Sequence, residues 1–311
     1  MQKIQKAIKE NPYIENTPNT IFTVLLSNVL ENNPKIQPFK NYYIHGIIKY
    51  PEWKKDTDIF RFIQPEHLEL LKNNKAYFIF DASTEGFSTL YDEPFFDLLY
   101  YNCDVYKIQP EQIIFVSANL RDEQNIKIYC KENSRKPINV FSFVSFEQVL
   151  TIDDNNSFNE CENYFKESLK NCHRLHDNYY FSSLSRVNRT WRTYSQALLY
   201  DSALKKHALL SHDYADDNHL NFLETANLPS KTIKRFKKSL PLTVDRKDFS
   251  RNWALETPYR KIHDQTLFQL VNETQVEDFD ASSLFYSEKT FRPISLFQPF
   301  IIWGQPGANK F

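Results

Sequence analysis

The amino-acid sequence predicts an α/β protein built from two Rossmann-like halves. Short apolar runs alternate with longer helical stretches along most of the chain from about residue 75. Each apolar run is continuous, which is typical of strands in a parallel sheet that is covered on both faces. The chain has 311 residues, of which 41% are hydrophobic and 25% charged, so it is long enough for two domains of ordinary size.

The first half is expected to form one sheet with helices between its strands. The strand at 42–50 is interrupted by Gly46, and the helix at 19–33 has asparagine at both ends. The expected strands lie at 42–50, 75–83, 112–120 and 138–146, and the expected helices at 19–33, 93–106 and 122–133.

A polar, Asn/Asp-rich stretch at 150–178 separates the two halves. We therefore assign 1–160 to an N-terminal domain and 161–311 to a C-terminal domain. The same alternation resumes in the second half, with a long polar helical region before its third strand. The expected strands lie at 179–186, 208–214, 266–274 and 299–304, and the expected helices at 190–207 and 287–297.

Charge argues against a nucleic-acid partner. The 38 basic and 39 acidic side chains give a net charge of −1, whereas a protein that neutralises many phosphates normally carries a basic excess or a basic face. The dense basic run is KTIKRFKKS at 231–239, which we interpret as a solvated helix face.

The cysteine spacing and the lengths of the apolar runs indicate in which cellular compartment the protein is expected. Cys103, Cys130, Cys161 and Cys172 are widely spaced, and no CxxC pair occurs. The first residues lack the apolar core of a signal peptide, and no window approaches the roughly 18 apolar residues that span a bilayer. We therefore expect a cytoplasmic protein with free thiols and no membrane span.

Several common site motifs are missing. The sequence has no GxxxxGK[ST], GxGxxG or GxSxG segment, which disfavours P-loop, dinucleotide-binding and α/β-hydrolase enzymes. The CHRLH segment at 172–176 has no second cluster at zinc spacing, and we interpret the acidic segments at 153–155 and 213–216 as surface loops. The residues therefore predict no metal site.

Open α/β sheets bind ligands at the carboxyl ends of their strands, so the polar residues that follow each expected strand are the site candidates. These segments are DASTEG at 81–86, SRVNRTWR at 185–192, NET at 272–274, SEK at 287–289 and GQPG at 304–307.

Three arginines stand out among these candidates. Arg186, Arg189 and Arg192 lie at three-residue spacing around an expected helix start. Guanidinium groups bind phosphate through bidentate bonds, and a helix N-terminus adds free amides and a positive dipole end. Three arginines there would suit a diphosphate, while a solvated helix edge is the alternative.

The segment around Glu288 also has two interpretations. Ser287 could simply cap a helix, or Lys289 could meet a phosphate while Glu288 accepts bonds from ribose hydroxyls. The spacing alone does not separate these possibilities. Gly304 and Gly307 follow the next strand, where a missing Cβ would let the backbone approach a ligand closely.

Three segments, in order, resemble a family of glycosyltransferase-like proteins of phages, giant viruses and bacteria. They are FSSLSRVNRTWRTYSQALLYDSALKK, LFQLVNETQVED and LFYSEKTFRPISLFQPFIIWGQPG. The last two are also similar to the nucleotide-sugar motif of the α1,3-fucosyltransferases. The resemblance covers roughly residues 75–311.

This resemblance implies a GT-B fold, in which two Rossmann-like domains face a central cleft and the second domain binds the nucleotide sugar. It implies transfer of a sugar, from a GDP-sugar in preference to other donors, to a glycan or other hydroxyl acceptor without a metal. A non-catalytic sugar- or nucleotide-binding module is the alternative. Relatives usually continue past the Gly-x-Pro-Gly turn, so the resemblance also implies a C-terminal domain truncated at Phe311.

The family's binding residues carry over by position. Ser185 and Val187 stand where relatives often have Asn and Arg, which leaves the phosphate contacts open. The resemblance implies that two groups of residues grip the donor. Ribose and diphosphate would be held by Glu273, Ser287, Glu288 and Lys289, and the leaving nucleotide diphosphate stabilised by Arg186, Arg189 and Arg192.

An inverting transfer needs a general base for the acceptor hydroxyl, and the resemblance implies that it comes from the N-terminal domain. We consider Glu85 first, Asp81 second and His45 third, because each follows an expected strand there.

Overall fold

The computed structural model describes residues 43–46, 58–60, 63, 65–82, 89, 95–144, 163, 166–167, 179–185, 188–213, 215–244, 262–274, 276 and 282–310, with only the backbone at 43–46, 81, 288 and 295. The chain divides into two compact units. Unit 1 comprises Met1–Val149 and Asp278–Phe285, and unit 2 comprises Leu150–Glu277 and Tyr286–Phe311. We had expected a single boundary after residue 160; a short segment of the second half thus groups with unit 1.

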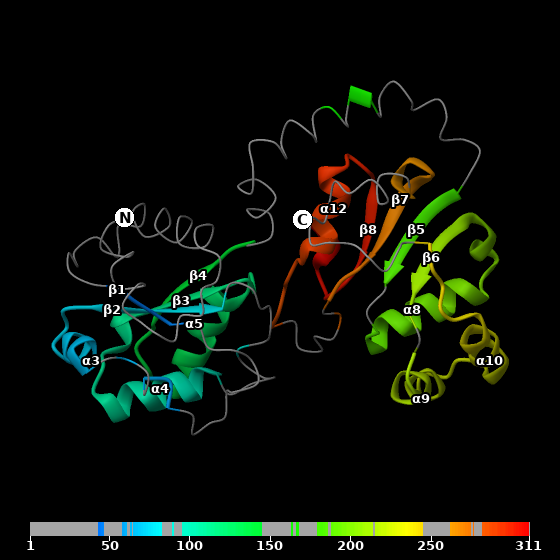
Figure 1. The fold of residues 1–311 in the computed structure, drawn as a ribbon. Helices are drawn as coiled ribbons and strands as arrows, with labels where there is room; N and C mark the ends of the chain where they lie inside the picture. The colour runs from blue at the N-terminus through cyan, green and yellow to red at the C-terminus, as the bar shows by residue number, and fades with distance from the viewer. Residues whose placement is uncertain are drawn as a thin grey trace. The chain divides into compact units, whose positions relative to one another are not determined.

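Unit 1 contains a parallel four-stranded sheet in the order β1-β2-β3-β4, with helices between the strands (Figure 1). Its strands are β1 (Tyr43–Gly46), β2 (Tyr77–Ala82), β3 (Ile113–Ser117) and β4 (Asn139–Ser142). Its helices are α3 (Pro65–Lys72), α4 (Phe95–Tyr106), the short η1 (Pro110–Gln112) and α5 (Asp122–Asn133).

Phenylalanine fills the main core of unit 1, on the side of the sheet that faces α4. The rings of Phe80 and Phe115 belong to neighbouring strands in register, and both pack on Phe95 at centroid distances of 4.9 and 4.7 Å. The opposite face carries a smaller cluster that includes Ile79 and Ile114. Because both faces are covered, continuous apolar strands are what this sheet requires.

A buried polar cluster lies at the carboxyl end of β3. The Asp122 carboxylate accepts hydrogen bonds from the Ser117 Oγ (2.5 Å), Thr89 Oγ1 (2.6 Å), Asn119 Nδ2 (2.9 Å) and Asn125 Nδ2 (3.0 Å). Burial raises the pKa of Asp122 to about 7, although these four donors favour its charged form.

The same cluster holds the segment that returns from the second half of the chain. The side-chain amides of Asn119 and Asn125 both donate to the Ser282 carbonyl, at 3.1 and 2.7 Å. The Leu120 amide donates to the Leu284 carbonyl at 2.9 Å. These bonds explain why Asp278–Phe285 belongs to unit 1.

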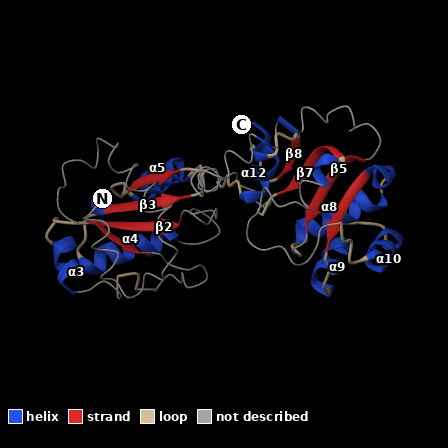
Figure 2. Cartoon of the chain, turned by 45° about the horizontal axis from the view of Figure 1, so that its top comes forward, coloured by secondary structure: helices blue, strands red, loops and turns tan. Residues whose placement is uncertain are grey.

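Unit 2 contains a second parallel four-stranded sheet, in the order β6-β5-β7-β8 (Figure 1). Figure 2 shows its strands in red and its helices in blue. Its strands are β5 (Tyr179–Ser185), β6 (Ala208–His212), β7 (Thr266–Asn272) and β8 (Phe300–Trp303). Its helices are α8 (Thr190–Asp201), η3 (Ala203–His207), α9 (Asp217–Thr225), α10 (Ser230–Ser239), α12 (Glu288–Ser295) and η4 (Ala308–Lys310).

The mixed α/β architecture with two parallel sheets is therefore confirmed. No helix in the described ranges is long and apolar enough to cross a membrane. Cys103 and Cys130 are buried free thiols of unit 1, while Cys161 and Cys172 lie outside the described residues. The expected helix at 19–33 lies outside them as well.

Candidate functional site

The strand order of unit 2 creates a switch point between β5 and β7. The chain runs from β5 through α8 to β6 on one side, and from β7 through α12 to β8 on the other. The two helices that follow β5 and β7 therefore leave in opposite directions. In open α/β sheets the crevice at such a point, at the carboxyl ends of the strands, is where ligands bind.

Side chains at the end of β7 show that α8 and α12 cover opposite faces of the sheet. The Asn272 side chain points to α8, because it accepts a hydrogen bond from the Ser195 Oγ at 2.8 Å. It also donates to the hydroxyls of Ser183 and Ser185 on β5, both at 2.8 Å. Glu273, one residue later, bonds to α12 instead, as expected from the alternation of side chains along an extended chain.

Glu273 fixes the start of α12. One carboxylate oxygen accepts from the Ser287 amide (3.1 Å) and from the Thr290 hydroxyl. The other accepts from the Ser287 hydroxyl (2.5 Å) and from the Thr274 amide (3.0 Å). The side chain is 1% exposed and its four acceptor positions are occupied by protein donors. The structure thus gives Glu273 a positioning role in place of the expected ribose contact.

Ser287 is the N-cap of α12, and its Oγ accepts a hydrogen bond from the Lys289 amide at 3.3 Å. The capping interpretation of this segment is therefore confirmed. The cap uses only backbone atoms of Lys289, so the side chain of that residue takes no part in it. A serine cap and a cationic site can share one helix start.

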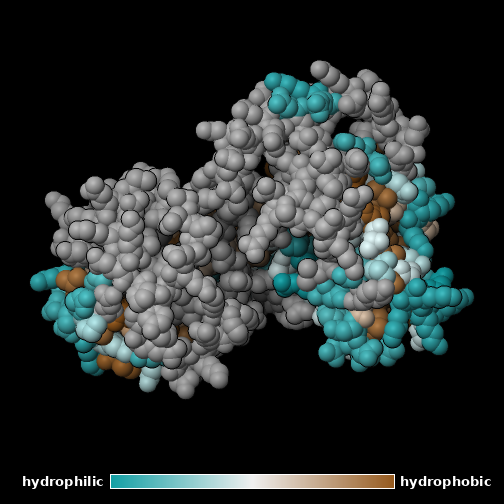
Figure 3. All heavy atoms as spheres, in the orientation of Figure 1, coloured by the Kyte–Doolittle hydropathy of each residue, from teal (hydrophilic) through white to brown (hydrophobic). Residues whose placement is uncertain are grey.

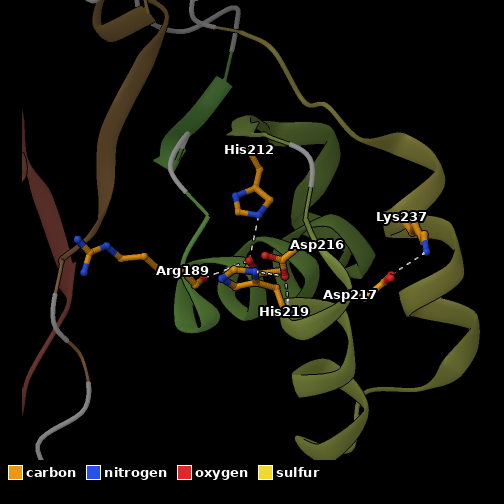
Figure 4. Close-up of polar contacts among 7 residues, drawn as sticks. Arg189, His212, Asp216, Asp217, His219 and Lys237 are labelled. Atoms are coloured by element: carbon orange, nitrogen blue, oxygen red, sulfur yellow. Dashed lines mark hydrogen bonds and ion pairs between the residues drawn. The ribbon is translucent and has the colours of Figure 1, made fainter.

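Three cationic side chains from two helices meet at Thr274. The Arg192 guanidinium of α8 donates to the Thr274 Oγ1 at 3.1 Å, and the Lys289 Nζ of α12 donates to the same oxygen at 3.2 Å. Arg189, the residue before α8, donates to the Thr274 carbonyl at 3.4 Å, with its guanidinium extended toward β7 (Figure 4). The arginines and the lysine thus reach one point from opposite faces of the sheet.

The position of these cations suits an anion. Arg192 is 3% exposed, so its charge lies in a region of low dielectric, where an added negative group interacts strongly. Lys289 stands in the first turn of α12, where the helix dipole is positive. A phosphate has enough acceptor oxygens to bond with both side chains at once.

His212, at the end of β6, positions the start of α8. Its Nδ1 lies 2.7 Å from the Ser185 carbonyl and therefore carries the proton, while its Nε2 lies 3.1 Å from the Thr193 Oγ1. That hydroxyl is also 3.1 Å from the Arg189 carbonyl. Burial lowers the pKa of His212, so the ring is neutral at pH 7. Figure 4 shows the ring directed at α8.

Two different structural constraints explain why glycine occupies the two positions after β8. A Cβ on Gly304 would lie 3.0 Å from the Ile302 Cγ2 and 3.3 Å from the Glu273 Cβ. Gly304 therefore makes room for the protein's own side chains, where we had expected room for a ligand. Gly307 has a φ of 95°, in the left-handed region that favours glycine in turns.

The remaining predicted site residues are placed less fully. Arg186 and Glu85 lie outside the described residues. Asp81 lies in β2 and His45 in β1, in register with Val116 and Ile79 respectively, and only their backbone is described. Glu288 begins α12, and its side chain is likewise not described. The roles expected of these five residues stay predictions.

Thr290 and His212 lie outside the candidate segments of the sequence analysis, and Thr274 lies in one of them, NET, without a role of its own. Thr274 follows β7 directly and could have been found by the strand-end rule, whereas Thr290 and His212 matter only through partners far along the chain. In the part of the chain that the structure describes, no three His, Cys, Asp or Glu residues are grouped to hold a metal.

The chain matches no protein-family model, and no curated protein or solved structure is significantly similar to it.

Proposed function

We propose that this chain is a GT-B glycosyltransferase that moves a sugar from a nucleotide-sugar donor to a glycan or other hydroxyl acceptor. The observation that carries the proposal is the meeting of Arg189, Arg192 and Lys289 at the switch point of unit 2. The donor's diphosphate would lie there, between the starts of α8 and α12.

The chemistry of sugar transfer explains why cations belong at this point. When the bond between the sugar and the nucleotide breaks, negative charge develops on the diphosphate oxygens. Guanidinium and ammonium groups that are already in place stabilise this charge without a cost of reorganisation. Thr274 keeps Arg192 and Lys289 in position before the donor binds, and a phosphate oxygen would replace its hydroxyl as their acceptor.

The remaining roles in this scheme are the positioning of the two helices and general-base catalysis. Glu273 holds the N-terminus of α12, and His212 holds the N-terminus of α8, so both are positioning residues. The general base for the acceptor hydroxyl would come from Glu85, Asp81 or His45 of unit 1, in that order of preference. The transfer requires no metal in this scheme, because side-chain cations neutralise the diphosphate. A GDP-sugar remains the favoured donor.

A non-catalytic module that binds a nucleotide or nucleotide sugar is the second candidate. The described side chains at this point of unit 2 either donate to Thr274 or position α8 and α12, and these contacts suffice to bind an anion without a general base. Such a module would bind its ligand at the same anion site but would not catalyse sugar transfer.

A donor screen separates the candidates. Purified chain is heated with UDP-, GDP-, CMP- and dTDP-sugars, and a ligand at 100 times its dissociation constant should add about 2.7 kcal/mol of stability. Release of free sugar from the bound donor supports the transferase, and binding without release supports the module. Failure of every donor to stabilise the chain would reject both.

A further inference from the structure

A basic surface covers the part of unit 2 that carries η3 and α10. In Figure 3 this side of unit 2 is covered mainly by hydrophilic side chains. Seven exposed basic residues form what we call the basic surface: Lys205, Lys206, Lys231, Lys234, Arg235, Lys237 and Lys238.

The sequence of α10 explains how so many cations come together. Thr232, Ile233 and Phe236 are buried against the rest of unit 2 and supply the packing energy of the helix. The five basic residues occupy the other positions between the terminal serines of α10 and are exposed to solvent. The interpretation of 231–239 as a solvated helix face is therefore confirmed, and it leaves open what the face is for.

Few acidic groups offset this charge. Asp201 pairs with Arg235, and Asp217 lies 3.7 Å from the Lys237 Nζ (Figure 4). No ion pair involving Lys206, Lys231, Lys234 or Lys238 occurs among the residues that the structure describes. The basic surface thus has a clear positive excess in a chain whose net charge is −1.

A hollow of about 550 Å³ lies within the basic surface. It is lined by the basic residues Lys205, Arg235 and Lys238, by the carboxylate Asp201 that pairs with Arg235, and by Tyr200, Ser202 and Ser239. The Lys205 Nζ stands 3.5 Å from the centre of the Tyr200 ring, so that ring face is occupied. Such a hollow offers several cationic donors to a phosphate group.

We propose that the basic surface docks unit 2 on a bilayer that contains anionic phospholipids. Clustered lysines and arginines are attracted to the negative surface of such a bilayer. Leu204 is 49% exposed beside Lys205, so an apolar side chain is available to enter the headgroup layer. A nucleic acid fits less well, because its phosphate backbone has no apolar layer for the exposed Leu204 side chain to enter.

The basic surface lies apart from the proposed donor site. Arg189 and Arg192 stand at the first turn of α8, whereas Tyr200 and Asp201 stand at its last turn. Twelve helical residues span about 18 Å. A docked unit 2 would therefore keep its donor site clear of the lipid, and the proposal does not depend on what that site binds.

The test is sedimentation of the full chain with vesicles of phosphatidylcholine alone or with 30 mol% phosphatidylserine, a fraction chosen as roughly that of an anionic leaflet. Wild-type chain should sediment only with the anionic vesicles and should be released at 1 M salt, where the Debye length is about 3 Å. Each basic residue contributes roughly fivefold, so the double variant K234Q/K238Q should bind about 25-fold more weakly.

A matched control uses two other exposed lysines. K127Q/K131Q changes the same charge at the same spacing on α5 of unit 1 and should bind like the wild type. Circular dichroism establishes that both double variants are folded. The proposal is overturned if the wild-type chain does not sediment with the anionic vesicles, or if the two double variants bind these vesicles with equal affinity. It is also overturned if K234Q/K238Q loses affinity only for a DNA duplex or for inorganic pyrophosphate.

Discussion

Replacement of Glu273 by glutamine should destabilise unit 2 by about 3 kcal/mol. The four donors divide between the two carboxylate oxygens, with one backbone amide and one hydroxyl on each. Glutamine has a single oxygen, so either orientation turns its NH₂ group toward an amide and a hydroxyl. The hydroxyl can rotate and accept, but the amide cannot. A buried donor without a partner costs about 1–3 kcal/mol, and the remaining bonds lose their charge-assisted strength.

Urea unfolding at pH 7, followed by tryptophan fluorescence, measures this loss. Three of the four tryptophans, Trp191, Trp253 and Trp303, lie in unit 2, and Trp53 lies in unit 1. Glu224→Gln is the matched control, because Glu224 is exposed on α9 and its change should stay within about 0.5 kcal/mol. The positioning role of Glu273 is refuted if the two variants are equally stable.

Three further predictions concern pH and packing. Burial raises the pKa of Asp122 to about 7, so its contribution to the stability of unit 1 is present below about pH 4 and is lost as pH rises to 7. Asp122→Asn should flatten this dependence of stability on pH, which amide hydrogen exchange in β3 measures. Burial lowers the pKa of His263 to about 4, so unit 2 should lose about 3 kcal/mol of its free energy of unfolding as pH falls from 6.5 to 4. His263→Gln should remove this part of the pH dependence, measured by urea unfolding. Gly304→Ala should cost about 1–3 kcal/mol of stability in thermal melts, because its Cβ would meet Ile302 and Glu273.

The strands were predictable because their apolar runs are long and continuous. The expected strand at 112–120 is observed as Ile113–Ser117, and it ends early because the following residues turn into the Asp122 cluster. The helix expected at 190–207 ends at Asp201, where Ser202 caps a separate turn by accepting from the Leu204 amide. Hydrophobic spacing does not report such a break, since both segments keep helical periodicity.

Helix α3 was not expected, and its sequence explains why. PEHLELLK has Pro at its first position and buries only Leu71 completely, so its pattern is weak. Its place is set by tertiary contacts: the Leu71 carbonyl accepts a hydrogen bond from the Gln112 side chain at 2.7 Å. Short helices that depend on distant partners leave little trace in the local sequence.

The candidate site was predictable only in part. The strand-end rule leads to the segments that contain Arg192 and Lys289, because it needs no knowledge of strand order. Their meeting at Thr274 depends on the order β6-β5-β7-β8, which places α8 and α12 on opposite faces. No local pattern encodes that order, so neither the meeting at Thr274 nor the positioning role of Glu273 could be foreseen.

Calorimetric titration of nucleoside diphosphates into the full chain tests the central claim most directly. Wild-type chain should bind GDP or UDP, and Lys289→Gln should weaken that binding by about tenfold or more, since a charge-assisted contact contributes about 1.5–3 kcal/mol. Lys127→Gln, which makes the same change on an exposed helix of unit 1, should bind as wild type does. The claim of a diphosphate site at Thr274 is contradicted if wild type binds neither nucleotide, or if the two variants bind with equal affinity.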